Sequence, residues 1–130
     1  MSKETVCMSK KVALVGHCGP DASYLRSAVS SSVRGTSILM IDEAARLDKA
    51  LVDGVDLILM NRQLDWGFDT EEGVELIRQL RMRHPQVKFM LVSNYPEAQQ
   101  EAVAAGALPG FGKREIGTSR VTELLKSALE

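Results

Sequence analysis

Short apolar runs alternate along this chain with segments whose apolar residues recur at helical spacing. The first run, Val12–Val15, is continuous and β-branched at both ends, which is typical of a strand buried on both faces of a sheet. A helical pattern follows it, and the alternation repeats about five times. Strict alternation of this kind predicts an α/β fold, in which a parallel sheet carries helices on both faces. The predicted strands cover residues 12–15, 37–41, 55–60, 87–92 and 108–111.

The size and the charge of the chain limit the classes of function. Its 130 residues are enough for one domain, and no repeat or interdomain linker divides them. The 16 basic and 17 acidic residues give a net charge of -1, which offers no electrostatic attraction to nucleic acid or to an anionic membrane. No apolar stretch approaches the roughly 20 residues that a membrane-spanning helix requires. We therefore expect a cytoplasmic protein with no nucleic-acid partner and no membrane partner.

The N-terminal residues differ from the rest of the chain. Residues 1–10 are mostly polar, so we expect a flexible N-terminal tail there and a single domain over residues 11–130. The chain has two cysteines, Cys7 and Cys18, which form no CxxC pair and are too few for a disulfide scaffold. We expect two reduced thiols.

Capping residues indicate where several helices begin or end. Pro20 fits the first turn of the helix that follows the first strand. Asp42 and Thr70 are predicted N-caps of the second and third helices, because their side-chain oxygens can accept from backbone N–H groups. Gly106 suits the left-handed position after the fourth helix.

Polar residues follow the carboxyl ends of the predicted strands. Ligands of open doubly wound sheets bind outside these ends, so the residues there form the candidate site. Asn61 is the most informative of them, because it ends the run predicted as the central strand and carries a neutral amide. In strand order, the candidates are Gly16, His17 and Cys18, then Asp42, Asn61, Ser93 with Asn94, and Lys113.

Five segments, in their order and spacing, resemble the receiver domain of bacterial response regulators. The resemblance extends from about Lys11 to the end of the chain. It implies a flavodoxin-like doubly wound sheet of five parallel strands in the order 2-1-3-4-5, with helices on both faces. The segments are Asp56–Asn61, Gly73–Ile77, Phe89–Ser93, Ala104–Ala107 and Gly110–Lys113.

The resemblance also assigns roles to positions at the strand ends. In the family, an acidic pair after the first strand and an acceptor aspartate hold a magnesium ion, and a hydroxyl and a lysine contact the phosphoryl oxygens. Ser93 matches the hydroxyl position and Lys113 the lysine position. Asn61 occupies the acceptor position, and Gly16 with His17 falls where the acidic pair belongs.

The chain departs from the family pattern in ways that bear on chemistry. Without a carboxylate at Asn61 there is no nucleophile. Glycine and histidine do not supply the hard oxygen ligands that magnesium prefers. We therefore expect no phosphorylation by the family mechanism, no metal, no cofactor and no enzymatic activity. Three further departures are Arg114 in place of a proline, Gly110 at the aromatic switch position with Phe111 one step out of register, and about four extra residues between Asn61 and Gly73.

Several of these residues have two readings on the sequence alone. Lys113 either extends to solvent or pairs with Asp21 or Asp65, or else it forms an anion site with Ser93 and backbone amides. In the long loop, Asp65 and Asp69 are either solvated or reach back as substitute carboxylates. The aromatic residues of that loop, Trp66 and Phe68, either pack on the body of the domain or anchor a partner.

The function that the resemblance implies is signalling through protein contacts. We expect a receiver-like module whose partner is a signalling protein or a second copy of itself. One alternative is a small-anion or ligand sensor that uses Asn61, Ser93 and Lys113 with His17 and Asn94. A redox switch at Cys18 is a third hypothesis. The expected interaction surface consists of Ala98, Gln99, Ala102, Phe111, Arg114 and Val121.

Overall fold

The described residues form one five-stranded parallel sheet with helices between its strands. The computed structural model describes residues 10–64, 67–68 and 70–129, so the predicted tail lies outside the described residues except for Lys10. The strand order is β2-β1-β3-β4-β5, and all neighbouring strands are parallel, as predicted. The strands are β1 (Lys11–Val15), β2 (Ser37–Ile41), β3 (Leu57–Asn61), β4 (Lys88–Val92) and β5 (Leu108–Phe111).

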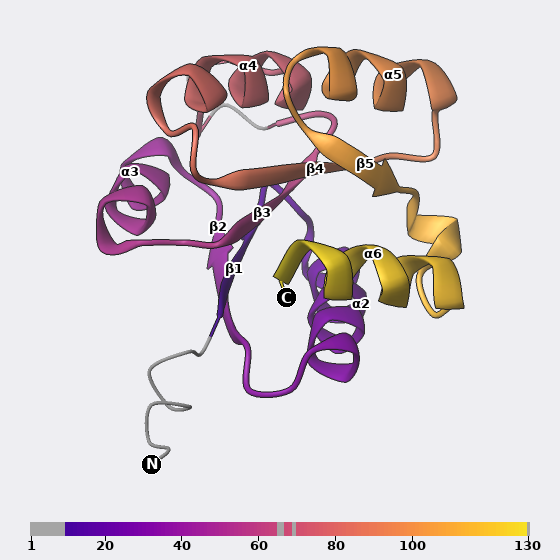
Figure 1. The fold of residues 1–130 in the computed structure, drawn as a ribbon. Coiled ribbons are helices and arrows are strands. Elements are labelled where there is room, and N and C mark those ends of the chain that lie inside the picture. Colours follow the sequence, from indigo (N-terminus) through magenta and orange to yellow (C-terminus); the bar gives the residue numbers. More distant parts are fainter. Residues whose placement is uncertain (1–9, 65–66, 69, 130) are drawn as a thin grey trace.

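Helices cover both faces of the sheet. Figure 1 shows α4 and α5 on one side of the sheet and α2 and α6 on the other. No helix among the described residues is long and apolar enough to cross a membrane. The helices are α2 (Gly19–Ser32), α3 (Ala44–Asp53), α4 (Gly73–Arg83), α5 (Pro96–Ala104) and α6 (Ser119–Leu129), with a 3-10 turn η1 (Lys113–Glu115) before α6.

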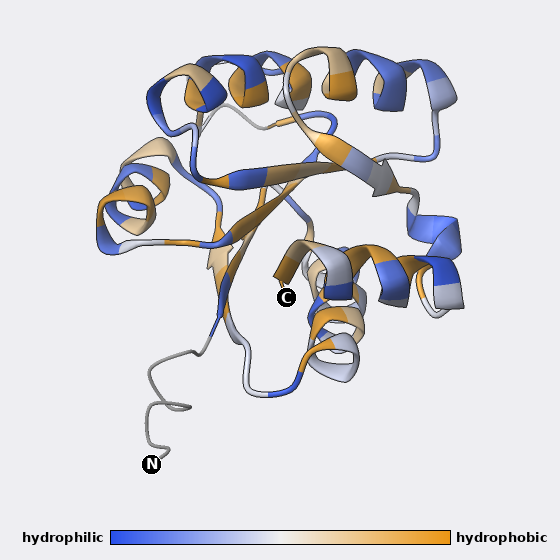
Figure 2. Ribbon diagram, viewed as in Figure 1, coloured by the Kyte–Doolittle hydropathy of each residue, from blue (hydrophilic) through white to orange (hydrophobic). Residues whose placement is uncertain are grey.

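The core consists of two apolar layers, one on each face of the sheet. Successive side chains of a strand point to opposite faces. In β3, Ile58 therefore packs with residues of α3, α4 and α5, whereas Leu59 packs with residues of α2 and α6. Figure 2 shows the strands mostly in hydrophobic colours and the polar parts of the helices away from the sheet. This burial of β3 on both faces explains why the strand reads as an unbroken apolar run.

Two helix starts differ from the sequence prediction. The N-cap of α3 is Glu43 rather than Asp42, and the Ala44 N–H donates to the carbonyl of Gly67 at 2.9 Å. The N-cap of α4 is Glu72 rather than Thr70, although the Thr70 hydroxyl accepts from the Glu72 N–H at 3.3 Å. The Gly73 N–H donates to the carbonyl of Arg62 at 2.7 Å. Backbone carbonyls of the long β3–α4 loop thus satisfy donors that side-chain caps were predicted to satisfy.

A bulge interrupts the pairing of β4 with β5. Met90 pairs with Leu108 and Val92 with Phe111, so two residues of β5 stand opposite Leu91 alone. A bulge adds one residue to a strand and turns the side chains that follow it to the other face. This extra residue accounts for the predicted one-step shift of Phe111.

Candidate functional site

Asn61 lies at the carboxyl end of β3, in the middle of the sheet, and its amide connects two loops. Its Nδ2 donates to the carbonyl of Gly16 at 3.0 Å and to the carbonyl of Gln63 at 2.8 Å. Both N–H groups of the amide are therefore used within the domain. The amide thus satisfies both carbonyl oxygens, which converge on it. A carboxylate at residue 61 has no hydrogen to donate and would leave both oxygens without this donor.

Gly16 leaves room for a side chain from the long β3–α4 loop. A Cβ atom at Gly16 would lie 2.5 Å from Cδ2 of Leu64, and Gly16 has a φ of 78°, which side-chain-bearing residues rarely adopt. Leu64 is buried, and its N–H donates to the carbonyl of Glu71 at 2.8 Å, which holds the loop in place. The volume that a side chain at residue 16 would need is thus occupied by Leu64.

The same loop packs against the rest of the domain through Phe68. This side chain is buried in the apolar layer of α3 and α4, so the reading in which it folds back onto the body is confirmed. At Gly67 the loop comes so close to β2 that a Cβ atom would lie 2.5 Å from the carbonyl oxygen of Asp42. Trp66, Asp65 and Asp69 lie outside the described residues.

His17 points inward and is held neutral. Its Nε2 lies 2.8 Å from the carbonyl of Leu59, so Nε2 carries the proton and donates it. The pKa of His17 is lowered from 6.5 to about 4, mainly by burial; the hydrogen bond to the Leu59 carbonyl opposes this shift, and the nearby Lys113 contributes to it. Within the described residues, the Nδ1 atom is buried and has no hydrogen-bond partner.

Lys113 forms an ion pair with Asp21, which confirms one of the two predicted partners. The Nζ–Oδ2 distance is 2.7 Å, and the two side chains are 34% and 29% exposed. The hydrogen bond from Lys113 lowers the pKa of Asp21, and a hydrogen bond from the Cys18 thiol lowers it further. Asp21 belongs to the first turn of α2, so this helix supplies a carboxylate to the lysine at the end of β5.

Ser93 and Asn94 organise the end of β4. The Ser93 hydroxyl accepts from the Tyr95 N–H at 3.1 Å, and the Ser93 N–H donates to the Phe111 carbonyl at 2.9 Å. The Asn94 Oδ1 accepts from the Arg114 N–H at 3.2 Å. These side chains connect the loops after β4 and β5, so the Ser93 hydroxyl oxygen and the Asn94 Oδ1 already have partners inside the domain.

A small cavity joins four of the predicted site residues. Its volume is about 160 Å³, and Asn61, Ser93, Asn94 and Lys113 line it, whereas Gly16 and His17 do not. Arg62 and Tyr95 also line it, and the Arg62 guanidinium lies 4.7 Å from the centre of the Tyr95 ring, as a cation–π pair. The sequence prediction missed this pair, although both residues lie just past the ends of strands.

The predicted interaction surface needs correction. Four of its six members, Ala98, Ala102, Phe111 and Val121, are buried. The three on helices lie on the sides of α5 and α6 that face the sheet, and the bulge in β5 turns Phe111 into the layer of α2 and α6. Only Arg114 is fully exposed, and Gln99 is half-buried.

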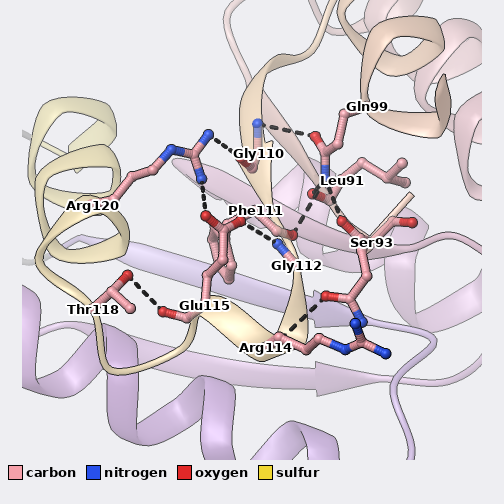
Figure 3. Close-up of polar contacts among 11 residues, drawn as sticks. Leu91, Ser93, Gln99, Gly110, Phe111, Gly112, Arg114, Glu115, Thr118 and Arg120 are labelled. Atoms are coloured by element: carbon pink, nitrogen blue, oxygen red, sulfur yellow. Dashed lines mark hydrogen bonds and ion pairs between the residues drawn. The ribbon is translucent and has the colours of Figure 1, made fainter. Parts of the chain in front are cut away.

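The side chain of Gln99 bridges the bulge between β4 and β5. Its Nε2 donates to the carbonyls of Leu91 at 2.9 Å, Ser93 at 3.1 Å and Phe111 at 3.3 Å, and its Oε1 accepts from the Gly110 N–H at 3.2 Å (Figure 3). A Cβ atom at Gly110 would lie 2.2 Å from the Leu91 carbonyl. A side chain at Gly110 is therefore excluded while this arrangement holds.

Beyond Gln99, a groove of about 620 Å³ lies between α5, β5 and η1. Arg120 fixes one side of it by pairing with Glu115 at 2.7 Å and donating to the Gly110 carbonyl at 3.1 Å (Figure 3). Exposed residues that line the groove are Asn94, Pro96, Gln100, Val103, Pro109, Arg114 and Arg120.

Comparisons with known proteins identify the fold. The chain is similar to the signal receiver domain of an HD domain-containing protein from Pseudomonas fluorescens Pf-5, with a TM-score of 0.76, 17% identity, and coverage of 94% of this chain and 88% of that one. It is similar to the receiver domain of NtrX from Brucella abortus, with a TM-score of 0.69, 18% identity, and coverage of 91% and 97%. A response regulator from Thermotoga maritima gives a TM-score of 0.71, 20% identity, and coverage of 93% and 98%. No protein-family model and no curated protein matches the chain. The chain has the flavodoxin-like fold of receiver domains.

Proposed function

We propose that the chain is a receiver-like module of a two-component type signalling system that acts through protein contacts and takes up no phosphoryl group. One observation carries the proposal: Asn61 uses both amide N–H groups to bridge Gly16 and Gln63. The amide has no nucleophilic oxygen anion. It is also built into the framework of the site, so the neutral side chain has a structural role of its own.

The arrangement does not fit a magnesium ion. Magnesium requires an octahedral shell of oxygen ligands. Here the two carbonyls that could contribute oxygens face the Asn61 N–H groups, and Leu64 occupies the side-chain volume at Gly16. Without a cation, the charge of a transferring phosphoryl group has no counterpart on this side of the pocket. No catalytic step is assigned to the site, and we propose that the chain is not an enzyme.

We assign the partner contact to the groove between α5, β5 and η1, because residues that line it are exposed, whereas four of the six residues expected from the family pattern are buried. Two bonding networks, one through Gln99 and one through Arg120, link the elements around this groove, and we propose that they keep it in one conformation. A surface fixed in one state can recognise a partner without a covalent switch, because recognition depends only on the affinity for that state.

Phosphorylation is tested by incubating the chain with acetyl phosphate or phosphoramidate and magnesium, followed by intact mass measurement. A phosphorylatable receiver domain treated in parallel serves as the control for the reagent. We expect no gain of mass in this chain. A stable gain of one phosphoryl group would refute the proposal, and peptide mapping would then locate the acceptor.

The alternative function, a small-anion sensor, is favoured by one observation, the two cations Arg62 and Lys113 that line the 160 Å³ cavity. Against it, Lys113 is already neutralised by Asp21. A thermal-shift screen with phosphates, nucleotides and carboxylates separates the two functions. Stabilisation by an anion that Lys113→Ala abolishes favours the sensor, and unchanged melting curves favour the interaction module.

A further inference from the structure

β2 is an outer strand of the sheet, and its own five residues lack the features that usually protect an edge strand, although the Arg26 guanidinium of α2 lies 3.5 Å from the Met40 sulfur. Its sequence, Ser37–Ile41, contains no charged residue and no proline. Leu39 is 40% exposed and Met40 is 46% exposed, and the two side chains lie on opposite faces of the sheet because they alternate along the strand. Natural edge strands are commonly blunted by charge, proline or a bulge, because their free backbone groups pair readily with another strand.

The hydrogen bonds at the two ends of β2 show which backbone groups are free. The Ser37 N–H donates to the carbonyl of Lys10 at 2.8 Å, and the Ile41 carbonyl accepts from the Gly16 N–H at 3.0 Å. The backbone groups of residues 37, 39 and 41 therefore face β1 and bond to it. The N–H and C=O groups of Ile38 and Met40 point away from the sheet.

We propose that two copies of this chain pair through β2 in antiparallel orientation, with a two-fold axis at Leu39. This register places Ile38 opposite Met40 of the second copy, so that each pair exchanges two backbone hydrogen bonds. The two Leu39 side chains then meet across the axis on one face. On the other face, Ile38 of each copy contacts Met40 of the other.

Charge supports a second copy as the occupant and antiparallel as the direction. Arg34 lies before β2, whereas Asp42 and Glu43 follow it, and all three are exposed. Antiparallel pairing brings the basic end of one strand to the acidic end of the other, and parallel pairing would bring like charges together. The net charge of -1 adds little repulsion between copies.

This contact is distinct from the groove of the proposed function. β2 and β5 are the two opposite edges of the sheet, so a dimer through β2 leaves the groove beside β5 accessible. The pairing would present two such grooves in one particle. Binding at two linked sites strengthens attachment to a multivalent partner without any new contact.

The test is sedimentation velocity of the full chain over a wide range of concentration, with hydrogen exchange measured on the same samples. We expect a concentration-dependent dimer in which the amides of Ile38 and Met40 are protected at high concentration and exchange at low concentration. Leu39→Lys should weaken dimerisation roughly tenfold or more, because two ammonium groups would meet at the axis. Met82→Lys on α4, at a residue that is 82% exposed, is the matched control and should leave dimerisation unchanged.

Three outcomes would overturn the proposal. The first is that the chain is monomeric at every concentration. The second is that it dimerises while the amides of Ile38 and Met40 stay unprotected. The third is that Leu39→Lys dimerises with the same affinity as the native chain. In the last two cases, a dimer that Arg114→Glu disrupts places the contact at the groove beside β5. That result refutes pairing through β2 and leaves the proposed function intact. Exchange on the native chain decides the matter even if Leu39→Lys folds poorly.

Discussion

Replacing Asn61 by aspartate changes a single group at the centre of the candidate site and reverses its hydrogen-bonding role. In the native chain, Nδ2 donates to the carbonyls of Gly16 and Gln63 at 3.0 and 2.8 Å. A carboxylate has no hydrogen to donate at pH 7, so an anionic oxygen would stand against two carbonyl oxygens. Asn61→Asp should therefore destabilise the domain, although the two side chains have nearly the same volume.

The size of the effect follows from the two lost bonds. Each net hydrogen bond contributes about 1 kcal/mol, and a buried carbonyl left without a donor costs about 1–3 kcal/mol. Asn61 is half-buried, so water reaches part of the site and the cost lies toward the lower end of this range. We expect a loss of about 2–4 kcal/mol, a large share of the roughly 5–15 kcal/mol that stabilises an ordinary domain.

The assay is urea unfolding followed by circular dichroism, in buffer that contains EDTA. The midpoint should fall while the slope stays constant, because the surface exposed on unfolding is the same. Asn61→Ala is the matched control, since it removes the same two bonds without adding a charge. The aspartate variant should be less stable than the alanine variant.

Divalent cations should act on the aspartate variant alone. The new carboxylate and the two carbonyls supply three hard oxygen atoms, which suit magnesium or calcium. Millimolar cation should therefore raise the midpoint of Asn61→Asp and leave the native chain and Asn61→Ala unchanged. We still expect no phosphorylation of this variant, because Gly16 and His17 provide no second acid.

The reasoning is wrong if Asn61→Asp is as stable as the native chain without metal. In that case, Lys113 would pair with the new carboxylate instead of with Asp21. The geometry allows this exchange of partners because residue 61 and Lys113 line the same cavity. Unfolding of Asn61→Asp with Asp21→Asn would identify this rearrangement. The hydrogen bonds from the Asn61 amide to Gly16 and Gln63 would in that case contribute little to the free energy of unfolding.

Two further predictions concern the neighbours of Asn61. The folded pKa of His17 is about 4 and its ordinary value is 6.5, so the unfolded state binds more protons between these values. Stability should fall by about 3 kcal/mol as the pH drops from 6.5 to 4, and His17→Gln should flatten this dependence in unfolding curves measured across the range. Gly16→Ala should cost about 2–4 kcal/mol, from its φ of 78° and its contact with Leu64. Combining it with Leu64→Ala should cost about 1 kcal/mol less than the sum, and strictly additive losses in a double-mutant cycle would contradict the packing argument.

The sequence predicted the fold well because the signals for it are local. Each strand is an apolar run with helical patterns beside it, and the structure confirms the five strands to within two residues at their ends. The position of Asn61 on the central strand was predicted correctly, and the pairing of Lys113 with Asp21 was one of the alternatives left open. Both depend only on which residues follow which strand.

The errors arose where one element contacts another that is distant in sequence. No local sequence pattern shows that the carbonyls of Gly67 and Arg62 would accept from the first N–H groups of α3 and α4, for which Asp42 and Thr70 were the predicted caps. The surface prediction failed at Phe111 because a bulge changes the face of every later side chain. Leu64 was missed for a similar reason, since its contact with Gly16 depends on how the long loop folds.

The position of Leu64 determines the order in which substitutions would have to be made to obtain a phosphorylatable variant. An acid grafted at Gly16 meets an occupied volume and a left-handed backbone, so the first step must shorten or redirect the loop after β3. Until then, each introduced acid costs stability and provides no catalytic gain. A phosphorylatable variant built by point substitutions alone would therefore pass through less stable intermediates.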